Sequence, residues 1–82
     1  MTRDEIRAAV LQALTSVAPE IDVGALQGDS AFRQEFDLDS MDFLNCVIAL
    51  HGRLGVDVPE NEYVKLATLN GAVDYLAGRL KP

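Results

Sequence analysis

Three stretches of this chain repeat apolar residues at intervals of three and four, and each follows a residue that can cap a helix. In the first stretch, Thr2 stands three residues before Glu5, which is the pattern of a capping box. The other two follow Asp39 and Thr68, whose side chains can accept hydrogen bonds from the free amides of a helix start. Because these intervals match the period of an α-helix, the sequence predicts an all-α fold without strands.

Residues between these stretches set the expected helix boundaries. We expect a first helix over residues 2–17, ended by Pro19, and a second helix that begins at Ser40 and ends before Gly55. Residues 60–66 are predicted to form one short helix. The last helix follows Thr68 and repeats the apolar residues Leu69, Ala72, Val73, Leu76 and Leu80. The prediction is a small four-helix bundle of three main helices and one short helix, with a long loop between helices one and two.

The loop over residues 18–39 is unusually long for so small a domain. A connection of about twenty residues usually has a function or crosses between distant helix ends. Apolar residues are expected to pin it to the core: Ile21, Val23, Leu26, Phe32 and Phe36.

Chain length limits the possible activities. With 82 residues, the chain is long enough for one compact domain over residues 1–82 and too short for two. A domain of this size buries about 60–65% of its unfolded surface, which leaves no room for a deep catalytic cavity. We therefore expect no catalytic residues and a role other than that of an enzyme.

Thirteen acidic and seven basic residues give a net charge of −6. Such a charge repels nucleic acid and anionic lipid and favours partners with basic faces. The charged N-terminus and the lack of any apolar run of about twenty residues predict a protein that is neither exported nor inserted in a membrane. A single cysteine, Cys46, excludes an internal disulfide and fits a reducing compartment. We expect a cytoplasmic monomer.

Ser40 stands where the second helix begins, within the stretch "EFDLDSMDFL". The free amides and the positive dipole end of a helix start would tolerate a phosphate ester on its hydroxyl. His51 is the only histidine and lies eleven residues further along the same helix, roughly 16 Å away, so it cannot activate this serine. Ser40 is therefore predicted to be an acceptor that another enzyme modifies.

The other reactive side chains receive simpler interpretations. Acids gather around Ser40 without the spacing of an EF-hand loop, so we expect a solvated face and no metal site. Cys46 is expected to be a small buried apolar residue, and His51 a solvated surface residue.

The tripeptide "DSM" at residues 39–41 resembles the Asp-Ser-Leu/Met phosphopantetheine attachment motif of acyl carrier proteins. The resemblance continues through the turn at Val58-Pro59, the short third helix, the threonine-capped last helix and a Tyr-Leu pair near the end. It covers essentially the whole chain. The tripeptide alone is weak, but together with the length, the acidity and the helix order it identifies the chain as a member of this family, as a discrete and specialised carrier.

The resemblance implies a specific chemistry. A phosphopantetheinyl transferase would use coenzyme A to attach a 4'-phosphopantetheine arm to Ser40, between Asp39 and Met41. The thiol of the arm would carry acyl groups as thioesters between partner enzymes of fatty-acid, polyketide or related biosynthesis. The surface that the partners read is expected to include Asp37, Leu38, Asp42, Phe43, Leu44 and Asn45. The acyl chain could fold back between the second and third helices, against Leu44, Ile48, Tyr63, Val64 and Leu66.

The sequence also departs from the family pattern. Asp37 occupies a position where a glycine is common. Asn45 and the run His51-Gly52-Arg53 stand where carriers of fatty-acid synthesis usually bear several glutamates. Asp42 is the only acid on the second helix. These differences favour a dedicated pathway over the housekeeping fatty-acid carrier, while the acyl cargo stays open. The alternative is an unmodified helical interaction module that kept a carrier-like fold.

Overall fold

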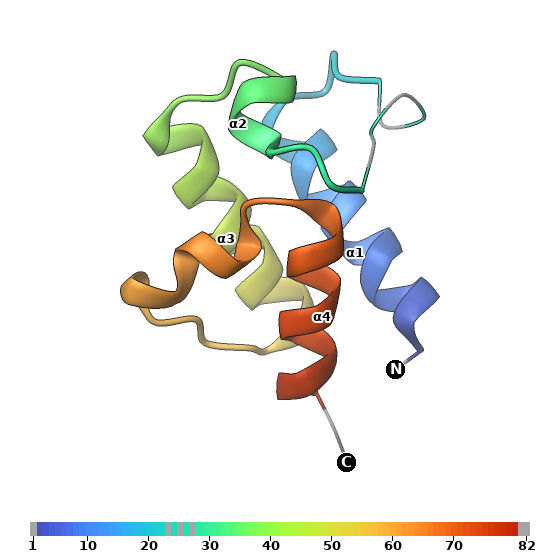
Figure 1. Cartoon of the computed structure of the whole chain (residues 1–82). Coiled ribbons are helices and arrows are strands. Elements are labelled where there is room, and N and C mark those ends of the chain that lie inside the picture. Colours follow the sequence, from blue (N-terminus) through green and yellow to red (C-terminus); the bar gives the residue numbers. More distant parts are fainter. Residues whose placement is uncertain (1, 23, 25, 27, 81–82) are drawn as a thin grey trace.

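The computed structural model describes residues 2–22, 24, 26 and 28–80, and Val23 lies outside them. Within these residues the regular structure is entirely helical, as predicted (Figure 1). The elements in chain order are α1 (Arg3–Val17), α2 (Phe32–Glu35), α3 (Ser40–Leu54), the 3-10 helix η2 (Glu60–Leu66) and α4 (Leu69–Arg79). The three main helices and the short one are confirmed. Helix α2, inside the long connection, was not predicted.

The predicted caps explain where the main helices begin. The hydroxyl of Thr2 accepts a hydrogen bond from the amide of Glu5, and the Glu5 carboxylate accepts one from the Thr2 amide. Asp39 and Asp42 form a second capping box at the start of α3. At the other end of α3, Gly55 adopts the left-handed backbone (φ 69°) that favours glycine. The α1 boundary differs from the prediction by one residue, because Thr2 is the cap and not a helical residue.

The core lies where α1 packs against both α3 and α4 (Figure 1). Helix α1 contributes Ile6, Val10 and Leu14, all almost fully buried. Helix α3 is partly sunk into the core and partly apolar on its exposed side, because Cys46, Val47 and Leu50 are buried whereas other apolar residues are exposed. These exposed residues are Met41, Leu44 and Ile48. The 3-10 helix η2 packs beside α4 and buries Leu66.

The long connection is fastened to the start of α4. The Phe32 amide donates to the Ala67 carbonyl over 2.8 Å, and the Asn70 amide donates to the Gly28 carbonyl over 2.9 Å. The two segments lie so close that a Cβ atom on Gly28 would meet the side-chain carboxamide of Asn70. Of the apolar residues expected to pin the connection, Leu26 and Phe32 are buried, while Ile21 and Phe36 are half-buried. The connection is therefore part of the packed structure.

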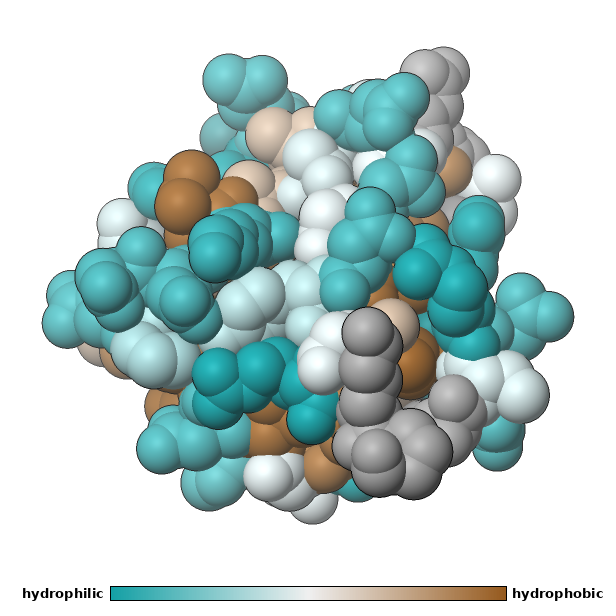
Figure 2. All heavy atoms as spheres, turned by 60° about the horizontal axis from the view of Figure 1, so that its bottom comes forward, coloured by the Kyte–Doolittle hydropathy of each residue, from teal (hydrophilic) through white to brown (hydrophobic). Residues whose placement is uncertain are grey.

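Hydrophilic side chains cover most of the face that surrounds the C-terminal end of α4, with small apolar areas between them (Figure 2). No helix in the part of the chain that the structure describes has both the length and the apolar character needed to cross a membrane.

Candidate functional site

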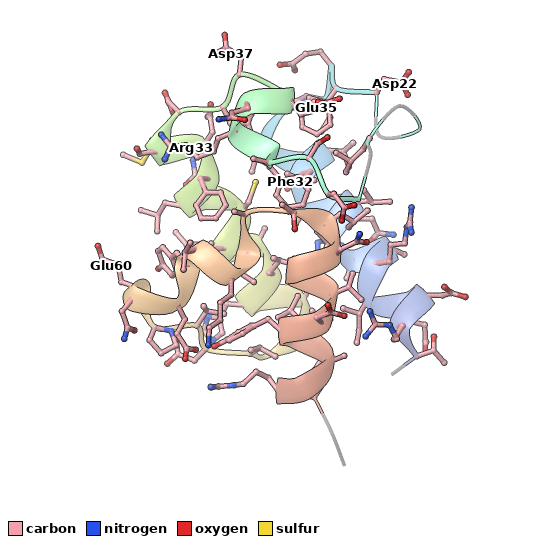
Figure 3. All side chains as sticks on the ribbon, viewed as in Figure 1. Asp22, Phe32, Arg33, Glu35, Asp37 and Glu60 are labelled. Atoms are coloured by element: carbon pink, nitrogen blue, oxygen red, sulfur yellow. The ribbon has the colours of Figure 1, made fainter. Side chains whose placement is uncertain are left out.

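Ser40 is the first residue of α3, and its side chain is exposed. Arg33 reaches it from α2, and its Nη2 atom donates a hydrogen bond to the Ser40 Oγ atom over 3.1 Å. Figure 3 shows this arginine extending from α2 toward the start of α3. The sequence prediction missed Arg33, although it is the only basic residue in the acidic connection over residues 18–39. A cation therefore lies at the predicted acceptor hydroxyl.

The acidic side chains near Ser40 have separate roles. Asp39 and Asp42 are held in the capping box, in which the Asp42 amide donates to the Asp39 Oδ1 atom over 2.8 Å. Asp37 points away from the body of the molecule (Figure 3). Among the described residues, no group of three histidine, cysteine, aspartate or glutamate side chains could hold a metal ion. The two capping acids thus fix the backbone that presents the serine.

Asp37 adopts a left-handed backbone with φ 53°, a conformation that favours glycine. Immediately after it, Leu38 is buried, and its amide donates to the Arg33 carbonyl over 3.0 Å. The reversed φ at Asp37 lets the chain turn from α2 into the cap of α3. Asp37, which replaces the glycine that is common at this position, therefore has a strained backbone.

A groove of about 610 Å³ lies beside Ser40, between α3 and η2. Three of the five residues predicted for an acyl pocket line it, namely Leu44, Tyr63 and Val64. The other residues of its lining are Arg33, Ser40, Phe43, Glu60 and Ala67. Glu60 lies on η2, away from Arg33 (Figure 3). The lining is mostly apolar, with charged groups from two different elements.

Two residues predicted for the pocket lie elsewhere. Leu66 is 2% exposed and belongs to the core, because it is the buried residue of η2. Ile48 is 59% exposed and is not part of the lining, since it lies two helical turns beyond Ser40 on α3. The remaining residues predicted for partner recognition, Asp42 and Asn45, lie in the first half of α3, where Asn45 is exposed.

Cys46 and His51 are placed as the sequence predicts. The Cys46 thiol is buried, and this burial, helped by the charge of Asp42, raises its pKa to about 11. Such a thiol is almost entirely protonated near neutral pH and is a poor nucleophile. His51 is exposed in the last turn of α3.

Comparisons with known proteins agree with this geometry. The family model described as "Phosphopantetheine attachment site" matches residues 6–76. An acyl carrier protein from Campylobacter fetus is 32% identical over 78 residues, which cover 95% of each chain. The chain belongs to the acyl carrier protein family. Another acyl carrier protein, from Acidothermus cellulolyticus, is 30% identical over 77 residues and covers 94% of this chain and 90% of its own.

A solved structure extends the comparison to the fold. A protein from Anaplasma phagocytophilum that is described as an acyl carrier protein superposes with a TM-score of 0.84, covering 99% of this chain and 94% of the other. At 24% sequence identity this likeness concerns the fold alone.

Membership in the family brings a covalently attached cofactor, 4'-phosphopantetheine, and a role as carrier together with a transferase and acyl-handling enzymes. The residues around Ser40 fit this group. The exposed hydroxyl can accept a phosphate ester, and the Arg33 guanidinium is a suitable donor for phosphate oxygens. The adjoining groove offers apolar side chains to whatever the arm carries.

Proposed function

We propose that Ser40 carries the 4'-phosphopantetheine arm and that the chain shuttles acyl groups, bound as thioesters, between partner enzymes. The observation that supports this assignment is the exposed hydroxyl of Ser40 at a capped helix start. The other serines differ: the Ser16 hydroxyl donates to the Ala13 carbonyl within α1, and Ser30 is half-buried before α2. Of the three serines in the chain, Ser40 alone combines exposure with a groove beside it.

Attachment joins the Ser40 Oγ atom to the phosphorus of coenzyme A that bears the pantetheine group. The bond from this phosphorus to the bridging oxygen breaks, and adenosine 3',5'-bisphosphate leaves with the electron pair. The serine proton must pass to a base. Because His51 lies roughly 16 Å along α3, we infer that the transferase supplies that base. Ser40 is thus the acceptor in a reaction that another protein catalyses.

The exposed face of α3 supports a dedicated pathway. Met41 and Ile48 are 63% and 59% exposed, and Asn45 between them carries no charge. Arg53, at the far end of the helix, donates a hydrogen bond to Gln12 on α1 over 2.8 Å. A partner that reads this face meets apolar groups where other carriers present carboxylates, so partner choice depends more on shape and apolar contact than on charge.

The test is the intact mass of the protein after incubation with coenzyme A and a broad-specificity transferase. We expect the wild type and Ser30→Ala to gain the mass of the arm and Ser40→Ala to gain none. Circular dichroism must show that both variants keep the helical fold. A known carrier protein in the same tube controls for transferase activity. If that carrier is modified and the wild type is not, the chain is an unmodified interaction module.

A further inference from the structure

Phe43 separates two spaces in the molecule. On one side its ring lines the groove beside Ser40, which measures about 610 Å³. On the other side it lines a small space inside the core, enclosed mainly by residues of α1 and α3, with one residue each from α2, η2 and α4, and measuring about 10 Å³. The groove falls within the range of about 300–1,000 Å³ that is typical of ligand sites. The inner space is near the minimum needed for one water molecule.

Tyr63 holds Phe43 in this position. The two rings meet edge to face, with centroids 6.2 Å apart and planes at 66°. Such pairs contribute about 0.5–1.5 kcal/mol beyond the burial of their surface. The two residues come from α3 and η2, the elements on either side of the groove, and both rings are half-buried. The aromatic pair therefore forms the floor of the groove.

We propose that Phe43, held by Tyr63, excludes acyl chains from the core and keeps the cargo in the surface groove. This inference rests on the proposed function of Ser40. An apolar chain attached beside Ser40 can lie along Leu44 and Val64, which are 37% and 76% exposed. It cannot pass further without displacing the Phe43 ring, because the space behind has room for no more than one group of the size of a water molecule. Cargo that stays at the surface remains accessible to a partner enzyme.

Removal of the Phe43 ring should let an acyl chain enter the core. Truncation of Phe43 would join the groove to the inner space and leave an apolar cavity on the order of 100 Å³, comparable to engineered cavities that bind benzene. Cys46 lines this inner space and is 5% exposed. In a protein whose arm ends in an acyl thioester, Cys46 is the only free thiol. Its reaction with a thiol reagent therefore reports whether the floor is open.

The experiment compares acetyl and octanoyl forms, made from the corresponding coenzyme A thioesters with a broad-specificity transferase. The proteins are the wild type, Phe43→Ala and the milder Phe43→Leu. Phe36→Leu is the matched control, because Phe36 is also half-buried but lines neither space. For each protein we measure the intact mass, the labelling rate of Cys46 and the contacts of the terminal octanoyl methyl group by nuclear Overhauser effects.

We expect the wild type and Phe36→Leu to label slowly and at the same rate in both acyl forms, with methyl contacts to Leu44 and Val64. In the Phe43 variants, labelling of the acetyl form should be at least about tenfold faster, since the thiol is no longer covered. The octanoyl chain should slow it again and contact Leu50 and Ala13, which line the inner space.

Methyl contacts to Leu50 or Ala13 in the wild type would overturn the inference. It would also fail if the chain stayed in the groove of both Phe43 variants and left their labelling rates equal in the two acyl forms. Absence of any mass gain is a different outcome, since it contradicts the modification of Ser40 and removes the cargo on which this inference depends.

Discussion

The raised pKa of Cys46 makes the stability of the fold sensitive to alkaline pH. Burial is the main cause and the charge of Asp42 is the second; together they raise the pKa from 9.0 to about 11. A group with a higher pKa in the folded state binds its proton more tightly there than in the unfolded chain. Its contribution to stability is therefore complete below pH 9 and is lost as the pH rises toward 11.

The size of the loss follows from the shift. Each pKa unit corresponds to about 1.4 kcal/mol, so the thiol accounts for a loss of about 2 kcal/mol in the free energy of unfolding between pH about 8 and about 10.5. Replacing Cys46 by alanine removes this dependence. The same replacement leaves a small gap in the core, which costs about 1 kcal/mol at every pH. Cys46→Ala should thus be less stable than the wild type near pH 8 and more stable near pH 10.5.

Urea unfolding of the unmodified protein, followed by circular dichroism at both pH values, measures these free energies. Tyr75, whose pKa is raised mainly by its hydrogen bond to the Glu62 carboxylate, titrates in both proteins and cancels from the difference. The reasoning is refuted if the difference between Cys46→Ala and the wild type stays constant from pH 8 to 10.5.

Further predictions concern the backbone, the partners and the overall charge. Asp37→Gly should raise the free energy of unfolding by about 0.5–1 kcal/mol, because the strain energy that it relieves is larger than the entropic cost of folding a more flexible glycine. Asp37→Ala should lower the free energy of unfolding. Urea unfolding of both variants checks this, and an equal effect of the two would contradict it. The double change Asn45→Glu with Arg53→Glu should speed elongation by fatty-acid enzymes several-fold at low salt and little at high salt; equal rates for wild type and variant at low salt would exclude charge as the reason. Because the net charge is −6, moderate salt or millimolar Mg²⁺ should raise the melting temperature by about 5 °C, and an unchanged melting temperature would show that self-repulsion is negligible.

Local sequence patterns were sufficient to predict the main helices. The side chains of Thr2, Asp39 and Thr68 accept the expected backbone hydrogen bonds, and these contacts span only three residues. Helix α2 has no such signal, because its N-cap, Ala31, has no side-chain acceptor. This helix is held instead by the distant Ala67 carbonyl. Its existence therefore depends on tertiary contacts that no short stretch of sequence contains.

The same distinction applies to the candidate site. Ser40 was predicted from its motif and helix start, whereas the contact of Arg33 with Ser40 depends on the position of α2. The residues predicted for the acyl pocket fall in different places, because their positions around the helices and their packing differ. Tyr63 and Leu66 are three residues apart and share one edge of the 3-10 helix, yet Tyr63 lines the groove and Leu66 enters the core. Apolar character alone does not distinguish these two positions.

The hydrogen bonds that fasten the long connection to the start of α4 also fix α2, which supplies Arg33 to the groove, relative to the end of η2, which borders it. Arg33 and Ser40 follow the Phe32 amide closely in the chain, while the Ala67 carbonyl that binds this amide adjoins the end of η2. The bond divides the long connection into two shorter segments, and each segment has less conformational freedom than the undivided connection would have. Movement of α2, and with it of Arg33, away from the end of η2 must break this bond, so hydrogen exchange of the Phe32 amide reports this movement without a probe in the groove itself.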